Sequence, residues 1–146
     1  RLFELKNIAG VKDATGDPNR IDETLKKLGP DFIQLTGEDG FALEFNKRGG
    51  VGIISVTANI APKLCSDFQN YSKSETDNEI KEAERIDQIL QPIHKSLFIE
   101  SNPAPVKYAA KLLGLCGDEI RLPLVKIKKE TENHVKKVLL AAKLLT

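Results

Sequence analysis

Several residue types are absent or scarce in this chain of 146 residues, which contains no methionine and no tryptophan. Its two cysteines, Cys65 and Cys116, lie far apart and form no CxxC pair, which argues against a disulfide framework and a zinc site. We expect two buried thiols in the reducing cytosol, and therefore a cytoplasmic protein. Because translation begins with methionine, a chain that lacks this residue and starts at Arg1 is expected to be a piece of a longer protein.

Net charge and long apolar runs are also scarce. A net charge of +1 gives no electrostatic basis for binding nucleic acid or an anionic membrane. Lysines gather between positions 126 and 137, but no aromatic residues separate them, so a solvated helix face is expected there. No apolar stretch approaches the roughly 20 residues of a transmembrane helix, and the N-terminus does not resemble a signal peptide.

Strand and helix patterns alternate in the first half of the chain. Short apolar runs predict three strands, at 7–12, 32–36 and 51–56. The first helix is expected to begin with Asp17 as its N-cap and Pro18 as its first residue, and to end at Gly29. Strands separated by helices form βαβ units, so we predict an α/β fold with a parallel sheet.

The second half of the chain carries helical patterns only. Four helices are predicted, at about 62–74, 76–97, 103–113 and 135–145. Asn102 is expected to cap the third of them, with Pro103 at its first position, and Gly114 is expected to end it. His94 and His134 fall on helices without a partner at the spacing of a metal site or a catalytic triad, so packing or surface positions are expected.

Lys12 is the residue with the most chemical meaning, because it ends the first apolar run just before a turn and a helix start. The run at 8–11 is typical of a strand buried on both faces, where a lysine is costly unless it reaches a cavity. Desolvation in such a cavity favours the neutral amine, which can attack a carbonyl and form a Schiff base. The alternative is a strand-end lysine that simply reaches solvent. The carboxylates that follow, Asp13 and Asp17, are expected to serve the turn and the helix cap rather than a catalytic pair.

A sheet of only these three strands would be a poor complete fold. Its outer strands are apolar and carry little of the charge or proline that protects an exposed edge. We therefore expect the strands to belong to a larger sheet or barrel.

Three segments together carry a resemblance to a known family. They are NIAGVKDATG at 7–16, GGVGIISVTAN at 49–59 and ESNPAPVKY at 100–108. The chain resembles the C-terminal half of the dihydrodipicolinate synthase family, which belongs to the pyruvate-dependent class I aldolases together with N-acetylneuraminate lyase. The lysine strand alone would indicate only the wider aldolase group, whereas the NPxPxK segment favours the synthases. The resemblance extends over essentially the whole chain.

The resemblance implies a (β/α)8 TIM barrel followed by extra C-terminal helices. Residues 1–75 would form its last three βα units and residues 76–146 the helical extension, so that roughly the first five units would be absent. Active sites of such barrels lie at the carboxyl ends of the strands, where Lys12, Gly37 and the end of the third strand fall. The family usually forms homotetramers.

By the same resemblance, Lys12 would be the catalytic residue of a lyase that condenses pyruvate with L-aspartate 4-semialdehyde in lysine and diaminopimelate biosynthesis. The lysine would bind pyruvate as a Schiff base, whose imine acts as the electron sink in place of a metal or cofactor. Ile54, through its backbone carbonyl, and Gly37, through its main chain, would border the bound pyruvate. Thr36 is a further candidate for substrate binding, and Asn102 is either another or only a helix cap.

The piece is expected to be inactive by itself. The family's proton-relay tyrosine and its carboxylate-binding threonine pair belong to the missing N-terminal half, and Tyr71 and Tyr108 match neither role. A partner that supplies this half is therefore expected. Two alternatives remain, namely another pyruvate-dependent aldolase of the keto-deoxy-sugar type, and a non-catalytic split or decayed half-barrel.

Overall fold

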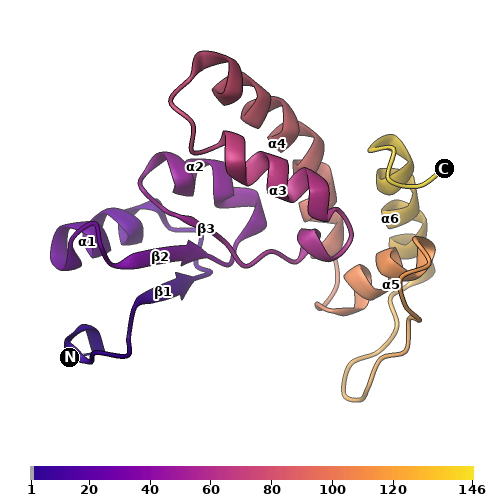
Figure 1. Ribbon diagram of the computed structural model, residues 1–146. Coiled ribbons are helices and arrows are strands. Elements are labelled where there is room, and N and C mark those ends of the chain that lie inside the picture. Colours follow the sequence, from indigo (N-terminus) through magenta and orange to yellow (C-terminus); the bar gives the residue numbers. More distant parts are fainter. Residues whose placement is uncertain (1) are drawn as a thin grey trace. The chain divides into compact units, whose positions relative to one another are not determined.

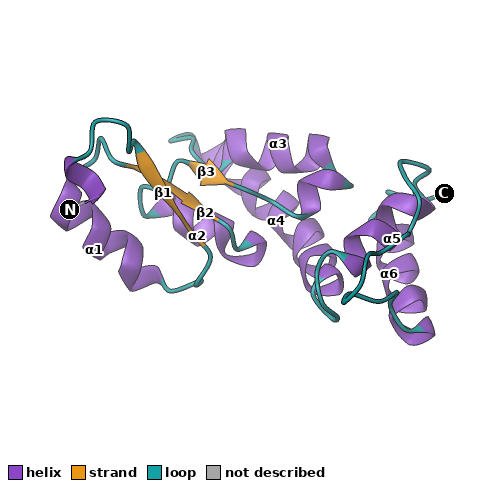
Figure 2. Ribbon diagram, turned by 90° about the horizontal axis from the view of Figure 1, so that it is seen from below, coloured by secondary structure: helices purple, strands orange, loops and turns teal. Residues whose placement is uncertain are grey.

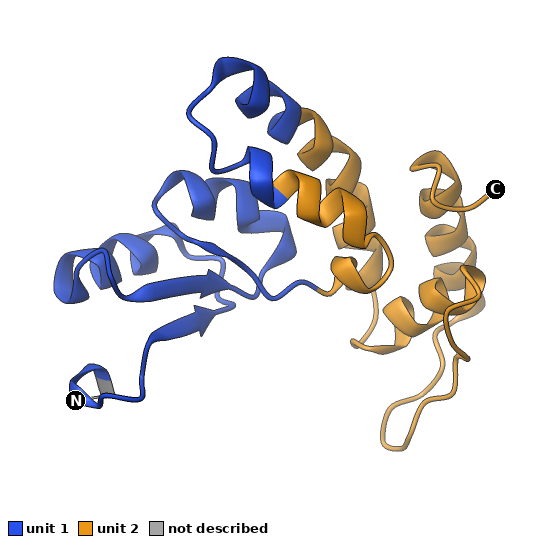
Figure 3. Ribbon diagram, in the orientation of Figure 1, with its two compact units in different colours: residues 1–55, 69–84 blue, residues 56–68, 85–146 orange. Residues whose placement is uncertain are grey.

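The computed structural model describes residues 2–146 and divides into two compact units (Figure 3). Unit 1 takes in the described part of Arg1–Ser55 together with Gln69–Glu84, and unit 2 comprises Val56–Phe68 and Arg85–Thr146. The sequence predicts a different boundary, between a barrel part at 1–75 and a helical extension at 76–146. That boundary stays a prediction.

Unit 1 contains a parallel sheet of three strands in the order β1-β2-β3 (Figure 1). Its elements follow one another as η1 (Leu2–Glu4), β1 (Gly10–Asp13), α1 (Pro18–Leu28), β2 (Ile33–Thr36), η2 (Asp39–Phe41), α2 (Ala42–Lys47) and β3 (Gly52–Ile53). The predicted α/β class and the parallel sheet are confirmed.

The first helix begins and ends where its capping residues predict. The Asp17 carboxylate accepts the backbone N–H of Asn19 at 3.0 Å, and Pro18 is the first residue of α1. At the other end, the N–H of Gly29 donates to the carbonyl of Leu25 at 2.9 Å. A side chain therefore fixes the start of α1, and the backbone of Gly29 closes its end.

Helices α1 and α2 cover one face of the sheet. In Figure 1 α2 lies above the strands and α1 lies to their left, and Figure 2, seen from below, shows the strands in front of α2. Ile21 of α1 and Phe45 of α2 are buried against the strands, and the side-chain amide of Gln34 donates to the carbonyl of Ile21 at 3.3 Å. The opposite face is open, because Ile33 and Ile54 keep about half of their surface exposed.

The third strand is shorter than predicted. The predicted strand spans 51–56, but β3 covers only Gly52–Ile53. Hydrogen bonds from Val51 and Ile54 to β2 extend the pairing by one residue at each end. The strand stops because Val56 already has helical dihedral angles (φ −74°, ψ −41°), where it leads into the next 3-10 helix. The first strand likewise begins at Gly10 rather than at residue 7.

Unit 2 is helical. It holds η3 (Thr57–Asn59), α5 (Ala104–Leu112), α6 (Lys129–Ala141) and parts of α3 (Pro62–Tyr71) and α4 (Asp77–Leu97). Its core consists of side chains that are essentially inaccessible to solvent, namely Leu90, Ile93, Leu97, Ala109, Val135 and Leu139. These residues come from the apolar stripes that predict the helices.

The end of α5 is predicted correctly and its start is not. Gly114 has φ 73°, a conformation that favours glycine, and its N–H donates to the carbonyl of Lys111. At the start, Pro103 occupies the N-cap position and Asn102 precedes it through a cis peptide bond. No side-chain hydrogen bond caps this helix, so the predicted N-cap role of Asn102 is wrong.

The two cysteines differ in their surroundings. Cys65 on α3 is buried as expected, whereas Cys116 is exposed, so the prediction of two buried thiols is wrong for Cys116. Cys116 follows Gly114 into an extended loop between α5 and α6, where the chain is largely solvent-exposed. Neither thiol is in a disulfide.

No helix in the described part of the chain combines the length and the apolar character that crossing a membrane requires.

Candidate active site

The three strands of unit 1 end together at one edge of the sheet. Parallel pairing places Lys12 beside Leu35, and Asp13 beside Thr36. Beyond this register, the N–H of Gly37 donates to the carbonyl of Asp13 at 2.7 Å, and the N–H of Ile54 donates to the carbonyl of Thr36 at 2.9 Å. The fold therefore brings Lys12, Gly37 and Ile54 to the same edge, at the carboxyl ends of the strands.

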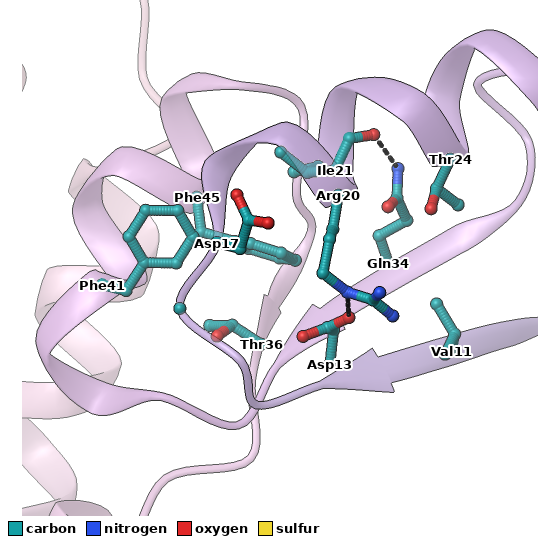
Figure 4. Close-up of a pocket in the computed structure, with 11 residues that line it drawn as sticks. Val11, Asp13, Asp17, Arg20, Ile21, Thr24, Gln34, Thr36, Phe41 and Phe45 are labelled. Atoms are coloured by element: carbon teal, nitrogen blue, oxygen red, sulfur yellow. Dashed lines mark hydrogen bonds and ion pairs between the residues drawn. The ribbon is translucent and has the colours of Figure 1, made fainter.

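Lys12 lies on the open face of the sheet. Val11 and Asp13 line a small cavity of about 70 Å³ between the sheet and the helices α1 and α2 (Figure 4). Neighbouring residues of a strand point to opposite faces, so Lys12 lies on the side away from the helices. The side chain of Lys12 is exposed, and Ile54 at the end of β3 has 52% of its surface exposed.

The side chain of Lys12 passes directly over Gly37. A β-carbon placed on Gly37 would collide with Cε of Lys12, would lie 2.9 Å from Cβ of Ala14, and would lie 3.2 Å from Nζ of Lys12. Only glycine leaves room for this crossing, in which the amine lies close to Gly37, just beyond the end of β2. The sequence predicts only that Lys12 and Gly37 lie at the same end of the strands, and the structure adds that the two residues are in direct packing contact.

Thr36 lies at this edge, but its side chain is on the helix side. It is buried, lines the same cavity as Asp13, and its hydroxyl accepts the N–H of Glu38 at 3.0 Å (Figure 4). The hydroxyl therefore serves the turn after β2. A role for Thr36 in substrate binding stays a prediction. Because its side chain lies on the helix side, such a role would involve its backbone.

Asp13 makes more interactions than the sequence indicates. Its carboxylate accepts the N–H of Thr15 at 2.8 Å and the hydroxyl of Thr15 at 2.5 Å, which confirms the predicted turn role. It also accepts Nε of Arg20 at 2.5 Å. Burial would raise the pKa of Asp13, but the hydrogen bonds from Thr15 and from Arg20 outweigh it and hold this pKa below its ordinary value.

A second carboxylate connects the turn after β2 with the end of β3. Asp39 is buried at the start of η2, and the hydroxyl of Ser55 donates to it. Nothing in the sequence predicts this contact of Asp39. Asp39 directly follows Glu38 in a turn segment, so an acidic residue at this position gives no specific signal for the contact.

The remaining candidates lie outside this edge of the sheet. His94 on α4 is buried and shares a 2.7 Å hydrogen bond with the hydroxyl of Thr57, which agrees with the packing position expected for it. Asn102 belongs to unit 2 and is exposed. Among the residues that the structure describes, no three His, Cys, Asp or Glu side chains come together in a metal-binding arrangement.

Comparison with known sequences gives a consistent result. Residues 1–142 match the model of the dihydrodipicolinate synthetase family. The chain is 68% identical over 145 residues to the 4-hydroxy-tetrahydrodipicolinate synthase of Pelagibacter ubique, a match that covers 99% of this chain and 50% of that protein. It is 52% identical to the synthase of Parvibaculum lavamentivorans, with coverages of 99% and 49%. The chain thus spans about half the length of the curated relatives it matches.

Solved structures show the same partial coverage. The dihydrodipicolinate synthase of Aquifex aeolicus aligns with a TM-score of 0.90 and 36% identity, over 97% of this chain and 47% of that one. The chloride-inhibited synthase of Acinetobacter baumannii, complexed with pyruvate, aligns with a TM-score of 0.91 and 37% identity, over 99% and 49%. The strands and helices described above therefore correspond to half of the TIM-barrel structures of these synthases. On the family match over nearly the whole chain, this protein belongs to the dihydrodipicolinate synthetase family.

Proposed function

We propose that this chain supplies the Schiff-base lysine of a 4-hydroxy-tetrahydrodipicolinate synthase, which condenses pyruvate with L-aspartate 4-semialdehyde in the biosynthesis of diaminopimelate and lysine. The observation that carries the proposal is Lys12, at the carboxyl end of a parallel strand, with its side chain laid over Gly37 on the open face of the sheet. The 68% identity with the Pelagibacter ubique synthase supports the same reaction.

The proposed chemistry begins with the amine of Lys12. It attacks the keto carbon of pyruvate, and loss of water gives an imine, which withdraws electrons from the adjacent methyl carbon. Loss of a methyl proton then gives an enamine, whose carbon attacks the aldehyde of the second substrate. The backbone of Gly37 and the carbonyl of Ile54 border the bound pyruvate in this proposal, with the main chain of Thr36 beside them.

Residues outside this chain are needed to complete the site. The sheet face that carries Lys12 is open, with Ile33 and Ile54 about half exposed, and the relatives are about twice as long as this chain. We therefore expect no turnover by the chain alone. A cytoplasmic location and a homotetramer of the completed protein belong to the same proposal.

The test is trapping of the imine with borohydride in the presence of pyruvate, followed by peptide mass spectrometry. It uses the chain alone, and the chain fused to the half of the Pelagibacter ubique synthase that it does not cover, here called the joined protein. The intact Pelagibacter ubique synthase is assayed in parallel, and Lys12→Arg is the matched variant that keeps the positive charge.

We expect a reduced pyruvate adduct on Lys12 of the joined protein and none in the Lys12→Arg variant. An adduct on a different lysine, or no adduct while the intact Pelagibacter ubique synthase is labelled, would contradict the assignment. Turnover with L-aspartate 4-semialdehyde separates a synthase from an aldolase that uses pyruvate with a sugar aldehyde.

A further inference from the structure

We infer that the ion pair between Arg20 and Asp13 positions Lys12 for imine formation, so that Arg20 is a positioning residue of the active site. The inference rests on the proposed function of Lys12. Neither residue touches the substrate in this scheme, because both lie on the helix side of the sheet, opposite the amine (Figure 4).

Asp13 is joined to three elements through different atoms. One carboxylate oxygen accepts both the N–H and the hydroxyl of Thr15 in the turn after β1. The other oxygen accepts Nε of Arg20, in the first turn of α1. Its backbone carbonyl accepts the N–H of Gly37, just beyond β2. Asp13 therefore couples β1, α1 and the end of β2.

This coupling acts on Lys12 through the backbone. Lys12 and Asp13 are joined by a peptide bond, and their side chains point to opposite faces of the sheet. Arg20 holds the Asp13 side chain toward α1, and this orientation determines the direction in which the Lys12 side chain projects from the open face. The same residue holds Gly37, over which the lysine side chain passes, with its amine 3.2 Å from the position of a β-carbon on Gly37. Movement of Asp13 would displace both Lys12 and the glycine beneath it.

In the Arg20–Asp13 pair, the carboxylate is less exposed to solvent than in an ordinary surface ion pair. The side chain of Asp13 is 20% exposed, whereas that of Arg20 is 57% exposed. Arg48 offers a comparison in the same unit, because it contacts Glu44 of α2 at 2.6 Å and Asp22 of α1 at 2.7 Å. Those contacts join helices and involve neither β1 nor Gly37.

Loss of Arg20 should disturb the position of the lysine more than the fold. Thr15 still supplies two hydrogen bonds to Asp13, so the turn after β1 remains. The carboxylate, however, loses its connection to α1. Misplacement of a reacting group by about 1 Å can slow a reaction by roughly 100-fold, so a decrease of about 10-fold to 100-fold in the rate of imine formation is expected.

The test compares three variants of the joined protein, namely Arg20→Met, Arg20→Lys and the control Arg48→Met. The rate of borohydride trapping at saturating pyruvate, the KM for pyruvate and the melting temperature are measured for each. We expect Arg20→Met to slow trapping by about 10-fold or more and to leave the KM within a factor of about three. Arg20→Lys should recover much of the rate, since an ammonium group can still donate to Asp13.

The outcomes separate positioning from stability. Positioning is supported if Arg20→Met and Arg48→Met lower the melting temperature to a similar extent while only Arg20→Met slows trapping. Equal trapping rates in Arg20→Met and the parent would overturn the inference, and so would equal slowing by Arg48→Met. Absence of an adduct in the unsubstituted joined protein would overturn the proposed function itself, and with it the role of Arg20.

Discussion

At the scale of single residues, the most specific feature of this chain is the crossing of Lys12 over Gly37. A lysine at the end of a strand is common, but a lysine whose Cε occupies the space of a neighbouring β-carbon requires glycine at that neighbour. Both residues can be found in the sequence, but only the structure shows that the position of the Lys12 side chain depends on the absence of a side chain at Gly37. Gly37 therefore carries a steric role in addition to the proposed backbone role.

Gly37→Ala tests this steric role. The new methyl group would collide with Cε of Lys12 and lie 2.9 Å from Cβ of Ala14, so the lysine must adopt another rotamer. We expect borohydride trapping of pyruvate by the joined protein to slow by about 10-fold or more. The control is Gly52→Ala, where the nearest atoms, in Leu35 and Gln69, are 3.4 Å and 3.9 Å away, an ordinary contact. Trapping by Gly37→Ala at the rate of Gly52→Ala would show that the lysine does not need this space.

At the scale of elements, the loop between α5 and α6 is held by a cluster of charges. Asp118 accepts Nζ of Lys111 on α5 at 2.8 Å and Nζ of Lys126 at 3.1 Å. The hydrogen bonds from these two lysines lower the pKa of Asp118 from 3.8 to about 2. Farther along, the carboxylate of Glu100 accepts the N–H of Lys128 at 2.9 Å, just before α6. The loop is thus tied to a helix although many of its apolar side chains are exposed.

This charge cluster predicts a loss of order in the loop at acid pH. The pKa of Asp118 in the folded chain, about 2, lies below its ordinary value of 3.8, so its stabilising effect is present above pH 3.8 and disappears as the pH falls toward 2. We expect amide hydrogen exchange in 114–128, corrected for the intrinsic pH dependence, to accelerate in this window. Asp118→Asn should exchange faster than the parent at pH 5, and the two should converge near pH 2. If the exchange rates of Asp118→Asn and the parent change in parallel with pH over the whole range, Asp118 has no such role.

The elements also show which features the sequence can predict. Asp17, Pro18 and Gly114 act on their own neighbours in the chain, so the ends of α1 and the end of α5 were predictable. The start of α5 was predicted wrongly, because Asn102 and Pro103 carry an N-cap pattern that the backbone there does not follow.

Contacts set by packing between elements were beyond the sequence. The bond between Asp13 and Arg20 depends on how α1 packs on β1, and that between Thr57 and His94 joins residues 37 positions apart. Residue patterns within the chain contain no record of such geometry. The resemblance to the family predicts Lys12 and Gly37 as site residues, whereas the contacts of Asp13 with Arg20 and with Gly37 emerged from the structure.

At the scale of the whole molecule, the open face of the sheet is the main departure from a self-contained fold. Ile33 is 44% exposed and Ile54 is 52% exposed, on the face opposite α1 and α2. Half-exposed β-branched residues on an uncovered sheet favour association with other apolar surfaces. The relatives, about twice as long, have additional chain that this protein does not match.

We therefore expect the chain alone to bind an apolar fluorescent dye and to scatter light as a species larger than a monomer. Ile33→Thr should lower dye binding, because it removes apolar surface from the open face while keeping a residue suited to a strand. Leu140→Thr is the matched control, since Leu140 on α6 is also 44% exposed and lies outside the sheet. If the two substitutions lower dye binding equally, or if the chain is a monomer that binds no dye, the open face is not the surface through which the chain associates. The joined protein should bind less dye than the chain alone.

The unequal exposure of the two cysteines has a practical consequence for such experiments. Cys116 stands in solvent while Cys65 is enclosed by α3 and its neighbours, and neither is in a disulfide. A maleimide probe should therefore attach at one position in the native chain and at two in the denatured chain. The natural sequence thus provides a single site for a fluorophore or spin label without any substitution, and the delayed reaction of the second thiol would time the opening of the helical unit.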